Sequence, residues 1–158
     1  MGTLKDKRCP PTTPERSRIM SKIHAKDTKI EVFFRKELFH LGYRYRKNVK
    51  RCAGTPDLYF RRYNTVIFIN GCFWHHHAGC RLATMPKQNS EFWLAKFAAN
   101  ISRDEADIET LRRQGLKVIV IWECLVKSMM KDERIKKQVI SEVLDFMIDT
   151  KEDYLVIS

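Results

Sequence analysis

The spacing of hydrophobic and polar positions along the chain predicts both helices and strands. Apolar residues recur at helical spacing in three segments, namely Lys29–Leu41, a long stretch from Asn89 or Ser90 to Gln114, and residues 132–149. Short runs rich in β-branched and aromatic residues predict strands at Tyr43–Lys47, Asp57–Phe60, Thr65–Asn70, Lys117–Trp122 and Tyr154–Ile157. Because helices alternate with buried strands, we expect an α/β fold with a small mixed sheet.

Turn and capping residues suggest where these elements begin and end. Gly42 and Gly115 are expected to stop the two helices that precede them, and Ser90 could cap the long helix. Pro14 suits the first position of a short helix running towards His24. We expect residues 1–11 to form a flexible basic arm and residues 12–158 to form a single domain.

The positive charge of the chain is concentrated in its first part. The 158 residues carry a net charge of +11, and residues 1–62 hold 17 basic and 6 acidic side chains, so the remainder is neutral. A one-sided basic surface favours a polyanionic partner, either nucleic acid or anionic lipid. The apolar runs are too short to span a membrane, and no apolar secretory segment begins the chain. The odd count of five cysteines favours a reducing compartment, so we expect a cytoplasmic protein.

The densest group of metal-binding residue types lies in the sequence GCFWHHHAGC, which begins at residue 71. Cys72, His77 and Cys80 are spaced closely enough to bind one tetrahedral zinc ion. Cys124 is the best candidate for the fourth ligand, because it follows a buried strand that we expect to pair with the strand before the cluster. Three cysteines and one histidine leave no open position, so we predict a structural Zn²⁺ site. The alternative is a reduced pair of cysteines in a His-rich surface loop.

The zinc ligands leave two histidines of this loop unused, His75 and His76. A histidine held rigidly beside a metal site is a good candidate for a general base. The two remaining cysteines, Cys9 and Cys52, lie in basic, turn-rich segments and are interpreted as free thiols.

Three acidic residues are candidates for a catalytic site. Asp57 follows Pro56 at the start of a predicted strand, where a carboxylate within a basic surface would bind Mg²⁺ or simply cap the preceding turn. Glu31 lies in the first turn of a helix, where the helix dipole alone favours it. Asp104 lies midway along the long helix, where it could be a solvated residue. Their occurrence together with the Cys/His cluster favours a catalytic function.

Together these residues resemble the family of very short patch repair DNA mismatch endonucleases. The resemblance covers about residues 14–125, and its most specific parts are the block Gly71–His75 and the later Glu91-Phe92-Trp93. The other matching segments are Thr28–Glu31, Pro56-Asp57, Phe68–Asn70, Asn100–Asp104 and Trp122–Cys124. The resemblance implies a restriction-endonuclease-like fold. It also implies a Mg²⁺-dependent endonuclease that nicks one strand on the 5′ side of the mispaired T in T:G mismatches, which arise when 5-methylcytosine deaminates.

The resemblance further implies a role for each candidate site residue. Asp57 and the backbone carbonyl of Ile69 would bind Mg²⁺, and Glu31 would reach the ion through water. His75 would be the general base that activates water, and Asp104 would fix its tautomer. The residues that match the structural zinc ligands are Cys72, His77, Cys80 and Cys124.

The resemblance also suggests which side chains contact DNA. Phe73 and Trp74 match aromatic residues that insert beside the mismatch, and Met20 matches a residue that enters from the opposite groove. Such wedges cost a few kcal/mol of unstacking, least at a mismatch. Because adjacent aromatic residues after a glycine are hard to bury together, we expect Phe73 and Trp74 to be exposed. The basic residues ahead of the Pro-Asp pair that we expect to contact DNA are Arg44, Arg46 and Lys47.

Two positions depart from the family pattern. Asn70 stands where the family commonly has a histidine near the leaving group, and Ile69 stands where it commonly has a threonine. Asn forms hydrogen bonds but carries no proton at neutral pH. Asn70 is therefore a candidate site residue whose role differs from that of a histidine.

The expected partner is double-stranded DNA with a T:G mismatch, joined by mismatch-repair proteins and a repair polymerase. We expect no membrane association, a monomer, and activity at the bacterial nucleoid. Two other interpretations remain open at this point. The chain could be a restriction-type endonuclease of the same fold that cuts paired DNA, or a non-catalytic zinc-stabilised DNA-binding module.

Overall fold

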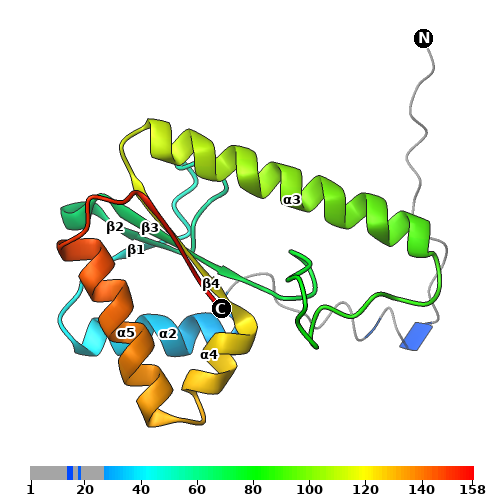
Figure 1. Ribbon diagram of the computed structural model, residues 1–158, viewed down its shortest axis with the longest axis horizontal. Coiled ribbons are helices and arrows are strands. Elements are labelled where there is room, and N and C mark those ends of the chain that lie inside the picture. Colours follow the sequence, from blue (N-terminus) through cyan, green and yellow to red (C-terminus); the bar gives the residue numbers. More distant parts are fainter. Residues whose placement is uncertain (1–13, 16–17, 19–26) are drawn as a thin grey trace.

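A five-stranded mixed sheet lies at the centre of the computed structural model, which describes residues 14–15, 18 and 27–158 (Figure 1). Its strands, in spatial order, are β1 (Arg46–Lys47), β2 (Leu58–Phe60), β3 (Thr65–Asn70), β4 (Lys117–Trp122) and β5 (Tyr154–Ile157). The first three strands pair antiparallel, whereas β3, β4 and β5 pair parallel. The predicted α/β class is therefore confirmed. The expected N-terminal arm and Met20 lie outside the described residues.

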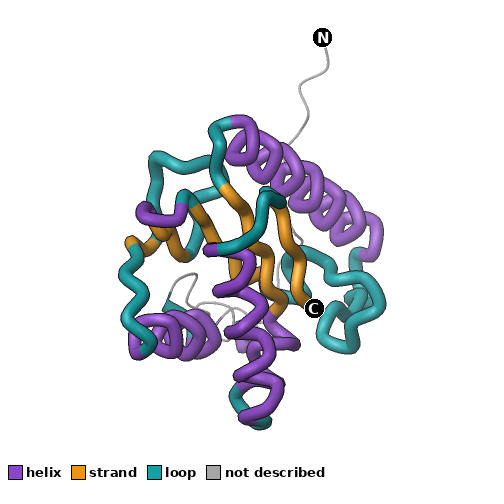
Figure 2. The backbone as a smooth tube through the Cα atoms, turned by 60° about the vertical axis from the view of Figure 1, so that its left-hand side comes forward, coloured by secondary structure: helices purple, strands orange, loops and turns teal. Residues whose placement is uncertain are grey.

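Helices cover both faces of the sheet. The long helix α3 (Ser90–Arg113) crosses one face, and Figure 2 shows the other helices on the opposite side. Those helices are α2 (Lys29–His40), α4 (Glu123–Met129) and α5 (Glu133–Ile148). A short 3₁₀ turn, Arg61–Tyr63, joins β2 to β3. None of the helices in the described part of the chain is long and apolar enough to cross a membrane.

The two faces of β3 and β4 carry separate hydrophobic cores. Ile67 and Ile119 are fully buried in the larger core, which also contains the apolar faces of α2, α4 and α5. Val66 and Val118 point to the other side and pack with Leu111 of α3. Alternate residues of a strand face opposite sides of a sheet. A strand that is covered by helices on both faces therefore needs an apolar residue at nearly every position. This requirement explains the continuous apolar runs in the sequence.

The three longer predicted helices and the three longest strands have nearly the expected bounds, whereas the short helix expected from Pro14 towards His24 lies mostly outside the described residues. Three other expectations were wrong or incomplete. The strand expected at Tyr43–Lys47 is only two residues long, because its partner β2 offers three residues for pairing. Ser90 does not cap α3; Asn89 is the N-cap residue, with φ +57°, and its side chain makes no capping hydrogen bond. Helix α4 was not predicted, since its seven residues bury only Val126 and Met129.

Lys117 ties the start of β4 to the end of α5. Its Nζ donates hydrogen bonds to the carbonyl oxygens of Phe146, Met147 and Thr150, at 3.1, 3.2 and 2.9 Å. A cation is favourable at this position because the last carbonyl groups of a helix lack partners within the helix.

Replacing Lys117 by Met should therefore destabilise the fold. We expect Lys117→Met to lower the free energy of unfolding by about 2 kcal/mol, because three partly buried carbonyl groups lose a charged donor. Urea unfolding followed by circular dichroism measures the change. Lys151→Met, at an exposed lysine nearby, should unfold like the wild type.

Candidate active site and metal centre

The parallel pairing of β3 and β4 brings two chemically important loops together. Asn70 at the end of β3 lies opposite Trp122 at the end of β4. The loop that follows β3 contains the three consecutive histidines, and α4 starts directly after β4. Both loops therefore leave the sheet at the same edge.

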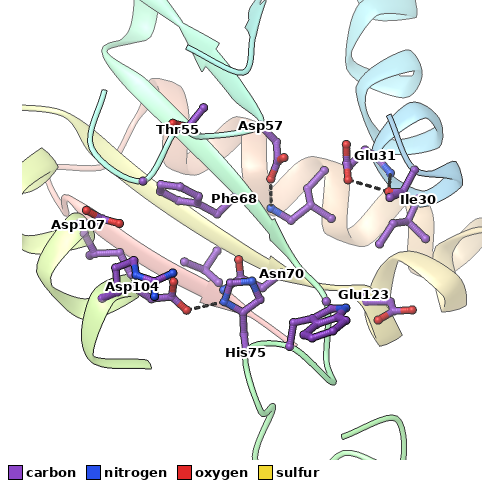
Figure 3. Close-up of a pocket in the computed structure, with 18 of the residues that line it drawn as sticks. Ile30, Glu31, Thr55, Asp57, Phe68, Asn70, His75, Asp104, Asp107 and Glu123 are labelled. Atoms are coloured by element: carbon purple, nitrogen blue, oxygen red, sulfur yellow. Dashed lines mark hydrogen bonds and ion pairs between the residues drawn. The ribbon is translucent and has the colours of Figure 1, made fainter. Parts of the chain in front are cut away.

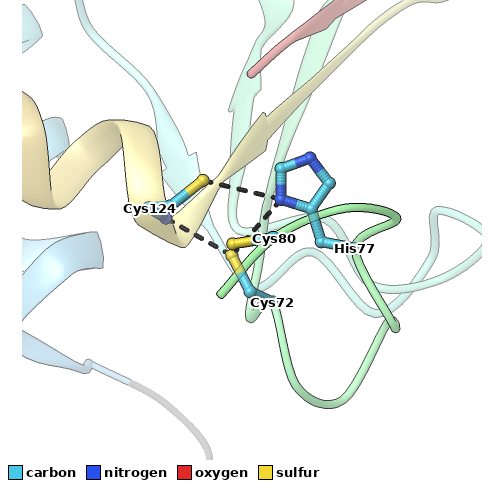
Figure 4. Close-up of side chains that lie close together, drawn as sticks. All are labelled: Cys72, His77, Cys80 and Cys124. Carbon is cyan, nitrogen blue, oxygen red and sulfur yellow. Dashed lines mark hydrogen bonds between the residues drawn. The ribbon is translucent and has the colours of Figure 1, made fainter. Parts of the chain in front are cut away.

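The first site at this edge is a cluster of three cysteines and one histidine (Figure 4). The ligand atoms of Cys72, His77, Cys80 and Cys124 all lie within 4.8 Å of one another. Nδ1 of His77 lies 3.6 Å from Sγ of Cys72 and 3.5 Å from Sγ of Cys124. A tetrahedral ion with ordinary metal–sulfur and metal–nitrogen bonds would require a sulfur–nitrogen distance of about 3.5 Å. The residues predicted from spacing therefore come together, and they could hold a metal ion.

The electrostatics of this cluster act on its ligands in both directions, because the pKa of the Cys80 thiol is lowered by the backbone N–H of Leu82, whereas the other two thiols hold their protons more tightly. Burial raises the pKa of the Cys72 thiol to about 12 and also raises the pKa of Cys124. Burial lowers the pKa of His77, which favours the neutral imidazole that ligates metals. The His77 ring stacks on Trp122 with ring centroids 4.0 Å apart, which fixes its orientation. Metal binding would displace the thiol protons, so the affinity of the cluster for metal should rise with pH.

The second site is a cleft of about 1050 Å³ on the other side of the same loop (Figure 3). Its lining includes the predicted residues Glu31, Asp57, Asn70, His75 and Asp104. They come from α2, the start of β2, the end of β3, the histidine loop and α3, respectively. The fold thus gathers into one cleft the five side chains that were candidates for catalysis.

Asp57 is the most perturbed carboxyl group of the cleft. Burial raises its pKa to about 6, the backbone N–H of Ile69 opposes this shift, and the nearby Glu31 carboxylate adds to it. The Ile69 N–H donates to Oδ2 of Asp57 at 2.7 Å across the β2–β3 pair. Glu31 accepts a hydrogen bond from the Thr28 hydroxyl at 2.8 Å. Two nearby carboxylates, one of them mostly buried, form an environment that favours a divalent cation.

His75 is oriented by a carboxylate on α3. Its Nδ1 is hydrogen-bonded to Oδ2 of Asp104. An ionised carboxylate only accepts hydrogen bonds, so Nδ1 carries the proton and Nε2 keeps its lone pair. The preceding residue is also held, because Nδ2 of Asn100 donates to the carbonyl oxygen of Trp74 at 2.8 Å. This arrangement suits a general base.

The structure adds two residues to the cleft that sequence reasoning missed. Asp107 lines it from α3, and Glu123 lines it from the unpredicted helix α4. The spacing of Asn100, Asp104 and Asp107 on one helical face could have revealed Asp107. No pattern in the sequence marks Glu123, since its position depends on how α4 packs.

Phe73 and Trp74 are half-buried, so the expectation that they would be exposed was too simple. Phe73 makes edge-to-face contacts with Trp93 and Phe97 of α3, with ring centroids 5.3 Å apart in each case. The long helix provides a partner surface that local reasoning about the loop did not include. Each ring nevertheless keeps part of its surface open to solvent.

The predicted basic residues lie apart from the cleft. Arg44 covers the ring of Phe39 at 4.2 Å, and Lys47 forms an ion pair with Asp27 at 3.1 Å. Arg46 lies next to Lys47 in the edge strand β1. The cations that line the cleft are instead Lys29, Arg103 and Lys127. A DNA contact by the β1 residues remains a prediction.

Known proteins similar to this chain point to one family. The sequence model of the family described as DNA mismatch endonuclease Vsr matches residues 11–81. The type II nicking enzyme V.NmeAIP of Neisseria meningitidis is 50% identical over 117 residues, which cover 74% of this chain and 83% of that protein. The DNA mismatch endonuclease Vsr of Escherichia coli is 35% identical over 147 residues, which cover 89% of this chain and 94% of that protein. The type II nicking enzyme V.XorIIP of Xanthomonas oryzae is 40% identical over 113 residues, covering 71% and 82%, respectively.

The raised pKa of Asp57 predicts that its charge lowers the stability of the metal-free fold. The carboxyl group of Asp57 has a pKa of about 6 in the folded state, against an ordinary value of 3.8. Below about pH 4 it is protonated in both the folded and the unfolded state, so it does not lower stability there. The cost grows as the pH rises from about 4 to about 6 and is constant above that, at on the order of 3 kcal/mol. Asp57→Asn should therefore be more stable than the wild type at pH 7.5 and equally stable near pH 4, by urea unfolding without added divalent metal.

Asp153→Asn is a control that should change the stability of the fold in the opposite direction. A hydrogen bond from Arg112 lowers the pKa of Asp153, so this carboxylate stabilises the fold at neutral pH. Its removal should lower stability at pH 7.5. Equal effects of the two substitutions would contradict the prediction.

Proposed function

The chain belongs to the DNA mismatch endonuclease Vsr family, and we propose that it nicks one DNA strand on the 5′ side of the mispaired T in a T:G mismatch. It is thus an endonuclease of mismatch repair, and its substrate is DNA. The single observation that carries the finer proposal is the cleft in which the His75–Asp104 pair faces a mostly buried Asp57. The names of relatives as nicking enzymes support cleavage of one strand.

In the proposed reaction, Nε2 of His75 accepts a proton from the attacking water while the water oxygen bonds to phosphorus. The bond from phosphorus to the 3′ oxygen breaks, and this oxygen takes a proton from solvent water, which leaves a 5′-phosphate and a 3′-hydroxyl end. Asp104 keeps the proton on Nδ1 and stabilises the imidazolium that forms. Asn70, buried at the end of β3, is proposed to orient the substrate by hydrogen bonding, since an amide does not donate a proton to a leaving group at neutral pH.

Asp57 is the residue that we propose to hold Mg²⁺, with the carbonyl oxygen of Ile69 as a second ligand and Glu31 acting through water. Bound Mg²⁺ supplies positive charge to the phosphate at the moment of cleavage. The raised pKa of Asp57 fits this role, because a cation in the cleft favours the ionised carboxylate. Hard carboxylate and carbonyl oxygens are the donors that Mg²⁺ prefers.

The cluster of Cys72, His77, Cys80 and Cys124 is proposed to hold a structural zinc ion. Thiolate and imidazole donors in a closed tetrahedral arrangement favour Zn²⁺ over Mg²⁺. The cluster fixes the loop from which His75 points into the cleft, so its role in activity is indirect.

Mismatch recognition is proposed to involve Trp74, which lines the cleft, and Phe73, whose ring packs against that of Trp74; both are partly open to solvent. Insertion of aromatic side chains between bases costs least where pairing is already weak. We also propose mismatch-repair proteins and a repair polymerase as partners, and activity at the bacterial nucleoid, where such a substrate occurs.

Cleavage of defined duplexes tests the function directly. With Mg²⁺, the wild-type protein should nick a duplex with one T:G pair and leave the matched T:A duplex intact, as denaturing electrophoresis of end-labelled strands would show. His75→Ala should slow nicking by about 10²- to 10⁴-fold, because the proton of the attacking water loses its acceptor. His40→Ala, at an exposed histidine on α2, is the matched control and should nick at the wild-type rate.

Equal cleavage of both duplexes would instead indicate a restriction-type enzyme. Salt-sensitive DNA binding without any product would indicate a binding module. Either result would contradict the proposed function.

Metal analysis tests the proposed zinc site. The purified protein should contain one zinc ion per chain by mass spectrometry of the metals. Cys80→Ala should lose most of this zinc and unfold at a lower temperature, because a structural zinc ion contributes to folding. Cys52→Ala, at a buried cysteine outside the cluster, should retain the zinc. Zinc retention by Cys80→Ala would contradict the assignment.

A further inference from the structure

Glu123 connects the two loops that leave the sheet beside the cleft. It is the first residue of α4, and its side chain is only 24% exposed. Its Oε2 accepts a hydrogen bond from the backbone N–H of Cys72 at 3.1 Å. Its Oε1 forms an ion pair with Lys127 of the same helix at 2.6 Å. One carboxylate thus joins segments that lie 51 residues apart in the sequence.

The turn held by Glu123 is the turn from which His75 emerges. The carbonyl oxygen of Gly71 accepts the N–H of His75 at 3.1 Å, and that of Cys72 accepts the N–H of His77 at 2.9 Å. Fixing the Cys72 amide therefore fixes the start of a hydrogen-bonded turn. The close fit extends to Gly71, where an added Cβ would lie 3.7 Å from Oε2 of Glu123 and 3.5 Å from the Trp74 ring.

Asp104 and Glu123 lie on opposite sides of His75 in the cleft (Figure 3). Asp104 on α3 holds its ring on one side. Glu123 on α4 holds the beginning of its loop on the other side. The ion pair with Lys127 alone would contribute little, since exposed pairs are worth about 1 kcal/mol or less. The hydrogen bond to the amide of Cys72, a fully buried residue, is charge-assisted and stronger.

We propose that Glu123 is a positioning residue that aligns His75 for catalysis through its hydrogen bond to the Cys72 amide. This inference rests on the proposed function, because it takes His75 as the general base. Glu123 is distinct from the metal cluster in its effect. The cluster is formed by four other residues, and within it the N–H of Cys124 donates to Sγ of Cys72 at 3.4 Å.

Two substitutions at Glu123 separate its hydrogen bond from its charge. Glu123→Ala removes both, whereas Glu123→Gln keeps an oxygen that accepts from the Cys72 amide but loses the ion pair. Glu133→Ala, at a first-turn glutamate of α5 paired with Lys136, reports the effect of losing an ordinary surface pair.

Single-turnover nicking of the T:G duplex is the main measurement, together with duplex affinity and bound zinc. We expect Glu123→Ala to lower the rate constant by about 10- to 100-fold, the scale of a small misplacement of a catalytic group. Duplex affinity and zinc content should stay at the wild-type values. Glu123→Gln and Glu133→Ala should nick within about threefold of the wild type, since the amide contact persists in each.

Each other outcome overturns the inference. A wild-type rate for Glu123→Ala would mean that the contact does not position His75. Equally slow Gln and Ala variants would assign the effect to charge. Loss of zinc together with the rate would assign it to the metal cluster.

A second readout does not depend on cleavage. The hydrogen-bonded Nδ1 proton of His75 should give a downfield proton NMR signal that shifts or broadens in Glu123→Ala and stays unchanged in Glu123→Gln. If the wild-type protein nicked no duplex, the proposed function would fail, and this signal alone would decide the positioning role. An unchanged signal in Glu123→Ala would overturn it.

Discussion

The site depends on the parallel pairing of β3 with β4. This pairing is continuous from Thr65 opposite Lys117 to Asn70 opposite Trp122, so the two strands end at the same edge of the sheet. The carboxyl ends of parallel strands are where ligands commonly bind in α/β proteins, because the loops there converge. Here one loop contributes both to the Cys/His cluster, which could hold a metal ion, and to the cleft that is proposed for catalysis.

Three consecutive histidines show how one short loop serves two sites. His75 is hydrogen-bonded to Asp104 in the cleft, and His77 points into the metal cluster. His76 between them has φ +48° and stacks on Phe97 of α3, with ring centroids 4.8 Å apart. A non-glycine residue rarely adopts positive φ, and such strain persists only where the surroundings enforce it. The strained residue allows adjacent side chains to point to different sites.

The partly buried carboxyl group of Asp57 lowers the stability of the metal-free fold at neutral pH. Burial raises its pKa to about 6, so the metal-free fold is less stable at neutral pH than it would be with an uncharged side chain there. A cation removes this cost by favouring the ionised form. The same desolvation that destabilises the metal-free fold therefore favours metal binding at the site.

The sequence alone determined the strands Thr65–Asn70 and Lys117–Trp122, the helices around them and the residue types of both sites, because periodicity and ligand spacing are local properties. Only the tertiary structure decided which distant residues meet. The short helix α4 carries little local signal, so neither its existence nor the contact of Glu123 with the Cys72 amide followed from the sequence. Likewise, Phe73 is half-buried because α3 crosses above its loop, and only the packing of the helix on the sheet determines that contact.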